Sequence, residues 1–477
     1  MQNKHLFSLL AFTMLASCTV GPDYERPQFY PDAEVAKNLK LEQAEASPVG
    51  QDWYKQFNDP ALNRLIERAW AASPNVRIAV HKLREARYGL LRSNVQSFPM
   101  LDINAGYNYD RSSRDIGFSI DRDYYQLGMD ASWELDIWGG NRRAAEASRA
   151  LFEAAGANLD NVRLVMAAEV ANNYLRTAQE QLRVARENLK LQQEIYQLVQ
   201  QKYDVGLTDF IALNQAQYAV ESTKTLIPQL ESEIEAYKNA VAVLLGVLPD
   251  DLAGTLDNTA DNLVRRRLSY NLKQLYRLRV DVIRNRPDVR LAEQNLIAQN
   301  AAVGEAVANL YPDVSISGFV GWQSGKIAGL INGDHSTYSY APSLKLPFFH
   351  WNQLMNTVNE QKEVKEQYVL SYQNAVLSAV SELRNSVVSI RQERQRNQAY
   401  RKSVKNMRNV LKYTLSKYKN GLIDFNDLLQ AEQELLKAQT ELLASNGSIY
   451  QYLIAFYKAA GGGFNSRFAV CVDCAKT

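Results

Sequence analysis

The chain has 477 residues, of which 46% are hydrophobic and 22% are charged, and its formal net charge at pH 7 is +2. This near balance of charge excludes the strongly basic surface on which nucleic-acid binding depends. With only four His and three Cys, a His-rich metal centre or a cysteine-ligated cluster is close to excluded. We therefore expect no metal, no cofactor and no nucleic-acid partner.

The first 18 residues have the features of a secretory signal. Lys4 precedes an apolar run from Leu6 to Ala16, which is too short to cross a bilayer as a helix. The run Leu15-Ala16-Ser17-Cys18 resembles the bacterial lipoprotein signal, which implies that Cys18 becomes the first mature residue and carries lipid. Thr19, at the next position, implies release to the outer membrane. An ordinary signal peptide with an incidental Cys is the alternative.

An internal repeat organises the rest of the chain. Residues 74–79 (Pro-Asn-Val-Arg-Ile-Ala) match residues 287–292 (Pro-Asp-Val-Arg-Leu-Ala), and residues 202–210 match residues 417–425. Two matched blocks in the same order indicate a tandem duplication. We predict a signal peptide, an N-terminal arm with a first short helix, a first repeat, a linker, a second repeat and a C-terminal tail, at residues 1–17, 18–73, 74–245, 246–286, 287–460 and 461–477.

Each repeat contains two predicted strands, because apolar and polar residues alternate there. The apolar positions are Leu101 to Tyr109, Tyr125 to Leu135, Val314 to Trp322 and Tyr338 to Leu346, at every second residue. About ten residues is the length that a tilted membrane strand needs. Four strands cannot close a barrel, for which about eight is the minimum, so the barrel must be assembled from several chains. Two soluble hairpins with one wet face are the alternative.

Long helices follow the strands. Residues 142–203 contain no Pro and a single Gly, and residues 353–419 contain neither, so each stretch can form a helix about 90 Å long or more. A seven-residue spacing predicts coiled-coil packing for Leu182, Leu189, Tyr196 and Tyr203, and for Val404, Leu411 and Tyr418. Gly206 and Gly421 are suited to end these helices, and a return helix follows each one.

The whole chain resembles the bacterial outer membrane factors, the TolC-like channel proteins, and in particular the lipoprotein branch that serves drug efflux pumps. The residues that carry the resemblance are Leu15 to Cys18, Val20 to Pro27, Trp53, Phe57, Asp59-Pro60, Glu134 to Gly139, Leu346 to Trp351 and Ala460 to Phe464.

The resemblance implies a mixed α and β membrane protein. Three chains would form a 12-stranded outer-membrane β-barrel, continued across the periplasm by an α-helical barrel. It also implies a homotrimer in outer-membrane lipid that docks to a periplasmic adaptor (membrane fusion) protein and an inner-membrane transporter. The expected function is passive conduction of drugs or other small toxic compounds to the exterior, with opening at the periplasmic helix tips.

The matched tips are the predicted adaptor contacts, namely Gly206, Leu207, Thr208, Asp209, Gly421, Leu422, Ile423 and Asp424. Turn chemistry explains the two glycines but not the repeated leucines, which a partner hairpin packing tip to tip would explain. A hydrophobic contact inside each helix end is the alternative.

The resemblance also suggests a periplasmic gate. An aspartate ring of the family falls on Asp427, its second aspartate falls on Gln430, and a tip Tyr matches Tyr418. The family's Asp and Arg partners of that Tyr fall on Ala212 and Ile423, so the closing network differs here. The alternative for Asp427 is a carboxylate that the helix dipole favours.

The sequence is consistent with three other functions. A duct with the same fold for polypeptides or other substrates is the main alternative, and a periplasmic coiled-coil scaffold without a pore is the second. An enzyme is the weakest, because no Ser-His-Asp spacing, phosphate loop or metal cluster is present. Cys471 and Cys474 form either a disulfide or part of a frayed tail.

Overall fold

The computed structural model describes residues 19–30, 50–111, 115, 121–173, 177–252 and 281–464. Cys18 with the signal peptide, most of the predicted linker, and Cys471 with Cys474 lie outside the described residues. Within the described part, the chain divides into two compact units. The sheet unit comprises residues 19–28, 82–156 and 291–374, and the hairpin unit comprises the remaining described residues.

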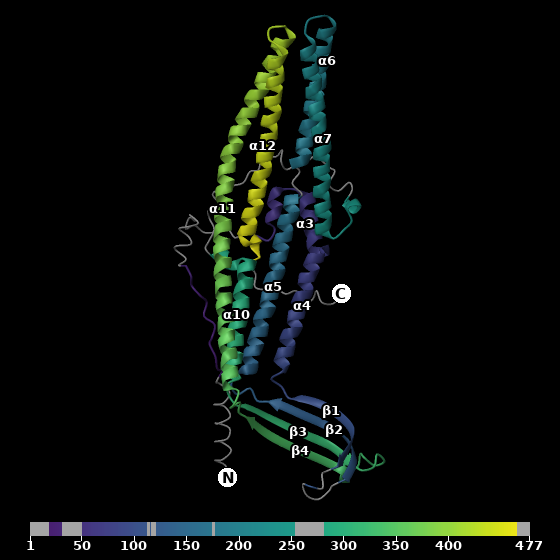
Figure 1. The fold of residues 1–477 in the computed structure, drawn as a ribbon, viewed down its shortest axis with the longest axis vertical. Coiled ribbons are helices and arrows are strands. Elements are labelled where there is room, and N and C mark those ends of the chain that lie inside the picture. Colours follow the sequence, from purple (N-terminus) through teal and green to yellow (C-terminus); the bar gives the residue numbers. More distant parts are fainter. Residues whose placement is uncertain are drawn as a thin grey trace. The chain divides into compact units, whose positions relative to one another are not determined.

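The two repeats have the same order of elements, except that two helices of the first repeat stand where the second has one long helix (Figure 1). The first contains α4 (Pro74–Val95), β1 (Met100–Arg111), β2 (Asp121–Glu134), α5 (Gly140–Asn173), α6 (Thr177–Asp204) and α7 (Phe210–Leu245). The second contains α10 (Pro287–Ala308), β3 (Asp313–Ser324), β4 (Ser336–Lys345), α11 (Trp351–Lys419) and α12 (Phe425–Ala459). The shorter elements are η1 (Trp53–Phe57), α3 (Pro60–Ala72), η3 (Pro249–Leu252), α9 (Asp281–Asn285), η5 (Gly333–His335) and η6 (Gly461–Gly463).

The four strands form one antiparallel sheet in the order β1-β2-β3-β4 (Figure 1). Their register places the predicted apolar positions on one face, because Ile103 pairs with Met129, Met129 with Val320, and Val320 with Tyr338. This face is open to solvent in the single chain, where Ile103 is 78% and Tyr338 is 80% exposed. No described strand pairs with the outer edges of β1 and β4. The two unpaired edges need further strands to pair with them, and the apolar face needs an apolar environment to cover it.

The opposite face of the sheet is mainly polar, and its aromatic residues are Tyr124 and Phe319. Asp102, Asp130 and Ser339 lie there, and the fourth residue of the same row is Phe319. A Cβ at Gly128 would lie 2.4 Å from the Phe319 ring, so only Gly fits beneath it. The ring therefore lies flat against the sheet, which leaves the polar face largely unobstructed.

The N-terminal arm is fixed to the helices of the sheet unit by Arg143, which is 4% exposed. Its guanidinium donates to the carbonyl of Val20 over 3.2 Å and forms an ion pair of 2.8 Å with Asp23. The Val20 N–H donates to the carbonyl of Trp138 over 3.0 Å, in the segment between β2 and α5. Thr19, next to the predicted lipidation site, lies against Gly139 of the same segment.

In the hairpin unit, the end of α12 packs against the N-terminal aromatic residues. Trp53 stacks on Tyr457 with ring centroids 5.3 Å apart. The first residues of the predicted tail also belong to this core, because Phe464 is 4% exposed and its ring meets Trp70 edge to face. A Cβ at Gly462 would lie 2.3 Å from Leu164, which explains a Gly at this position.

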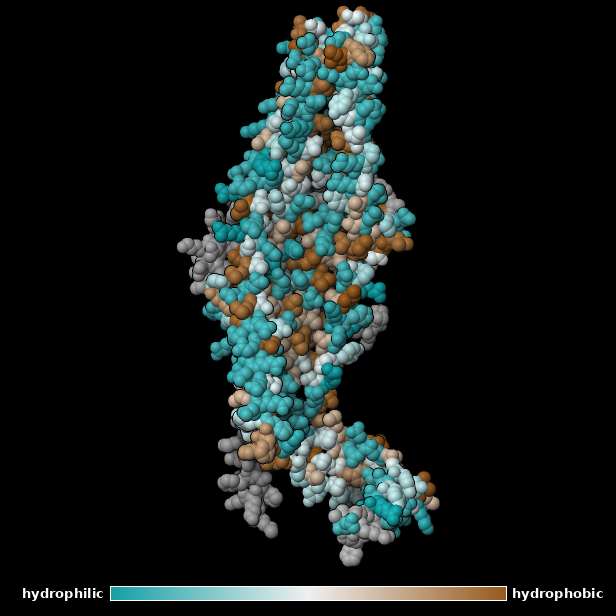
Figure 2. All heavy atoms as spheres, viewed as in Figure 1, coloured by the Kyte–Doolittle hydropathy of each residue, from teal (hydrophilic) through white to brown (hydrophobic). Residues whose placement is uncertain are grey.

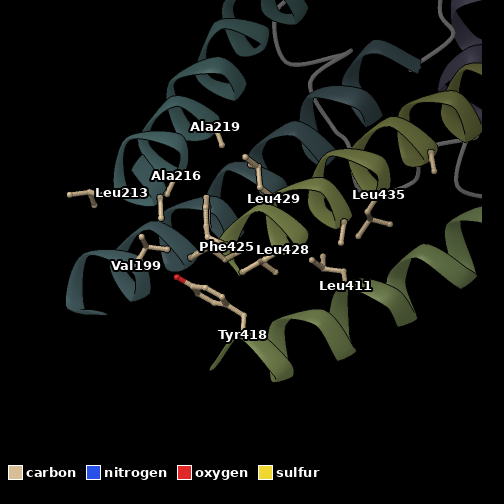
Figure 3. Close-up of a cluster of buried hydrophobic side chains, with 14 of the residues drawn as sticks. Val199, Leu213, Ala216, Ala219, Leu411, Tyr418, Phe425, Leu428, Leu429 and Leu435 are labelled. Carbon is tan, nitrogen blue, oxygen red and sulfur yellow. The ribbon is translucent and has the colours of Figure 1, made fainter. Parts of the chain in front are cut away.

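The long helices form two hairpins: α6 packs against α7, and α11 and α12 are joined at the second tip (Figure 1). A hydrophobic cluster joins them near their tips, and Figure 3 shows Val199, Ala216, Leu411 and Leu428 of the four helices lying within it. On α11 the predicted residues Val404, Leu411 and Tyr418 are buried in this cluster. The prediction for α6 was wrong by part of a turn. Its buried stripe runs through Ala185, Asn188, Gln192, Ile195 and Val199. Of the predicted residues, Leu182, Leu189 and Tyr196 are half-buried, and Tyr203 is exposed.

Candidate functional site at the hairpin tips

The two tips are built by the same turn. The N–H of Gly206 donates to the Tyr203 carbonyl over 2.9 Å, and the N–H of Leu207 donates to the Lys202 carbonyl over 2.7 Å. The second tip repeats both bonds, from Gly421 to Tyr418 over 3.1 Å and from Leu422 to Lys417 over 3.0 Å. This is the Schellman arrangement, which needs a left-handed residue. Gly206 has φ +75° and Gly421 has φ +73°, so Gly is the residue that forms this turn without strain.

The leucines that follow these glycines point away from the chain. Leu207 is 74% exposed and Leu422 is 71% exposed, so neither makes an extensive hydrophobic contact inside its own hairpin. Figure 2 shows hydrophobic atoms at the ends of the hairpins, whose sides are mostly hydrophilic. The two tips thus expose leucines at matched positions, and a partner surface packed on the tips would cover these side chains.

The carboxylates at the tips differ in their roles. Asp209 caps α7, because its side chain accepts a hydrogen bond of 2.8 Å from the N–H of Ala212. Asp424 begins α12 without a side-chain capping bond. The second tip therefore carries a carboxylate that its own helix end does not use, whereas the carboxylate of the first tip is committed to the helix.

Tyr418 lies at the centre of a contact between the two hairpins. It is 4% exposed, and its ring meets Phe425 edge to face with centroids 5.8 Å apart. Burial raises the pKa of its hydroxyl, which lies beside Thr208 of the other tip. The residue is thus packed inside the single chain and touches both tips.

Lys202, which the sequence did not single out, links the hairpins at this point. Its Nζ donates to the Tyr418 carbonyl over 2.6 Å and lies 4.2 Å from the centroid of the Tyr418 ring. A charged hydrogen bond and a cation–π contact therefore join the end of α6 to the end of α11. No sequence signal identifies this role, because a lysine beside Tyr203 on a coiled-coil helix has the pattern of a solvated residue.

Asp427 and Gln430 are both exposed on α12, one turn apart. Asp427 lies in the first turn of the helix, where the dipole favours a carboxylate. Its exposure leaves the side chain available to other chains or to a lumen. The geometry of one chain is compatible with both interpretations of Asp427, and it places Ile423 among the residues packed against the cluster.

The described residues contain no group of three or more His, Cys, Asp or Glu that could hold a metal ion. None of the described helices combines the length and the apolar composition that crossing a membrane requires.

Comparison with known proteins gives the family. Nodulation protein T of Rhizobium leguminosarum bv. trifolii is 26% identical, with 96% of each chain covered. The probable efflux pump outer membrane protein TtgC of Pseudomonas putida is also 26% identical, over 97% of this chain and 96% of that protein. The solved structure of the outer-membrane channel OprN superposes with a TM-score of 0.86 at 29% identity, and it covers 94% of this chain and 100% of that chain. The model of the outer membrane efflux protein family matches residues 65–247 and 278–462, and the chain therefore belongs to this family.

Proposed function

We propose that this chain is the outer-membrane exit duct of a tripartite efflux pump, and that its hairpin tips receive the periplasmic adaptor protein. Family membership places it in the outer membrane as a homotrimeric efflux channel. The observation that carries the proposal is the pair of exposed leucines, Leu207 and Leu422, on two identically built tips. We also propose that the chain catalyses no reaction of its own.

The sheet has the properties that a wall of a shared barrel needs. It offers two unpaired edges, an apolar face for lipid and a mainly polar face for water. Because lipid cannot satisfy unpaired backbone groups, the edge of β4 must pair with β1 of the next chain. Three chains with four strands each then close a 12-stranded barrel.

Docking at the tips follows from their construction. A Cβ at Gly206 or Gly421 would meet no atom within 4 Å, so no other part of the chain covers these two glycines. Both turns expose a leucine at the matched position, and the first tip also exposes Val205, Phe210 and Ile211. A helical hairpin of an adaptor, packed end to end, would bury both leucines and give the contact its register.

The conducted substrates are proposed to be drugs or other small toxic compounds. The relatives at 26% identity include a nodulation protein and an efflux pump component, so similarity alone does not choose among substrates. A polar lumen that conducts passively fits this breadth, because selection then belongs to the transporter and the adaptor.

The test is a double variant, Leu207→Ser with Leu422→Ser. We expect a normal yield of trimer and loss of pump-dependent resistance, because the turns keep their glycines while the apolar contact disappears. Leu248→Ser is the matched control, since Leu248 is 73% exposed but lies beyond the end of α7, away from the tips. Resistance that persists in the double variant at normal expression would place the adaptor contact elsewhere.

A further inference from the structure

A buried polar pair lies between the two hairpins, a few turns from the tips. Glu432 on α12 is 2% exposed, and Gln192 on α6 is 5% exposed. Each lies about one helical turn from residues of the hydrophobic cluster, which include Leu428 and Leu435 on α12 and Ile195 on α6. A carboxyl in such surroundings is costly unless it is neutral or fully hydrogen-bonded.

The hydrogen bonds of the pair are incomplete in a specific way. The Gln192 side chain lies beside the Glu432 carboxyl. Two buried atoms have no hydrogen-bond partner, Oε1 of Glu432 and Oε1 of Gln192. Both atoms are acceptors while the carboxyl is ionised, so neither can satisfy the other.

Protonation of the Glu432 carboxyl would supply the donor that this pair lacks. A carboxylic acid and a primary amide form a cyclic pair, in which the amide N–H donates to one carboxyl oxygen and the acid O–H donates to the amide oxygen. A proton on Oε1 of Glu432 would thus give both unpartnered atoms a bond at once. The ionised form leaves both atoms unsatisfied and buries a charge as well.

The electrostatic surroundings agree with a neutral carboxyl. Burial raises the pKa of Glu432 from its ordinary value of 4.5 to about 7, against a smaller opposing effect of the Gln192 hydrogen bond. No charged side chain contributes to this shift. The charged side chains on the neighbouring stretches of the four helices are exposed, namely Lys190 and Glu194 on α6, Glu221 and Lys224 on α7, Arg408 and Lys412 on α11, and Glu434 and Lys437 on α12. Two tyrosines of the same region are less exposed: Tyr196 is half-buried and Tyr418 is buried.

We propose that Glu432 and Gln192 form a protonation-dependent latch, which holds the α11–α12 hairpin against the α6–α7 hairpin when Glu432 is neutral and releases it when Glu432 is ionised. The proton is exchanged with water. The inference rests on the proposed function, because release of one hairpin from the other is the movement by which tips that close a tunnel can open it.

The direction of the pH effect follows from the raised pKa. Below pH 4.5 the carboxyl is neutral in both the packed and the separated state, so the latch is fully present. Between pH 4.5 and about 7 only the packed state keeps its proton, and the packing equilibrium falls by up to tenfold per pH unit in each chain. Above about pH 7 both states are ionised and the loss is complete.

The test is single-channel recording of the trimer in planar bilayers at fixed salt, from about pH 5 to pH 8. We expect the open probability of the wild type to rise with pH and to level off above about 7. Glu432→Gln should hold the low open probability of acid pH throughout this range, because an amide forms the same cyclic pair with Gln192. Gln192→Leu should move the transition to higher pH, since the ionised carboxyl loses its donor.

Glu434→Gln is the matched control, because Glu434 is exposed on the same helix and should leave the pH profile unchanged. If Glu432→Gln and the wild type share one pH profile, the latch is refuted and the channel function stands. A wild type without conductance at any pH would overturn both. Infrared difference spectra between acid and alkaline pH give an independent check, since Glu432→Gln must lose the band of one protonated carboxyl.

Discussion

Lys202 offers the sharpest test of the contact between the hairpins. Replacing it with Met keeps most of the aliphatic stem and removes the charge that lies 2.6 Å from the Tyr418 carbonyl and 4.2 Å from its ring centroid. A charged hydrogen bond contributes about 1.5–3 kcal/mol, and a partly exposed cation–π contact about 0.5–1 kcal/mol. Lys202 is only half-buried, and water can replace the donor at the carbonyl, so about 2 kcal/mol is expected to be lost. A loss of about 2 kcal/mol corresponds to about a 30-fold change in the equilibrium constant between tips in contact and tips apart.

The assay is the open probability of single channels, together with cellular uptake of a large hydrophilic antibiotic that the closed channel excludes. We expect Lys202→Met to raise both, and Lys202→Arg to lie between it and the wild type. Lys190→Met serves as the control, because Lys190 is exposed on the same helix. If Lys202→Met leaves the open probability and the uptake at wild-type values, the link to Tyr418 does not restrain the tips.

Three further predictions concern other parts of the chain. Asp427→Asn should reduce the selectivity of the channel for cations, measured as the reversal potential in asymmetric salt; an unchanged potential would mean that this carboxylate faces away from the lumen. Arg143→Met should make the N-terminal arm more susceptible to proteolysis, because the lost buried hydrogen bonds weaken its attachment by about 1–3 kcal/mol. Arg149→Met is the control, because the Arg149 side chain is 76% exposed. If the Arg143→Met protein is digested no faster than the control, other contacts hold the arm. Mass spectrometry of the native N-terminal peptide should find lipid on Cys18, and an unacylated start at another residue would exclude it.

The sheet was predictable because its pattern is local and has a period of two. Ile103 and Tyr338 were assigned to the apolar face from alternation alone, and the register across all four strands agrees. The stripe of α11 was predictable for a similar reason, since Leu411 and Tyr418 are apolar residues seven apart. On α6 the buried stripe includes Asn188 and Gln192, so a search for apolar repeats selected the neighbouring stripe instead.

The contacts of Lys202 and Glu432 between the hairpins were not predictable from the sequence. Lys202 and Glu432 are charged residues on helices rich in charge, and their patterns match those of solvated positions. Their roles depend on the distance to Tyr418 and Gln192, which are separated from them by more than 200 residues of chain. Only the packing of one hairpin on the other brings these groups together. The paired glycines of the tips were visible in the sequence because the turn itself requires them.

The central claim is that three copies of this chain enclose a continuous water-filled duct. Reconstitution of the purified trimer into a planar bilayer, with current recorded at fixed voltage, tests this claim most directly. We predict discrete conductance steps of uniform size, which Lys202→Met makes more frequent. A trimer that inserts into the bilayer yet gives no conductance steps, in the wild type or in Lys202→Met, would contradict the account and favour a scaffold without a pore.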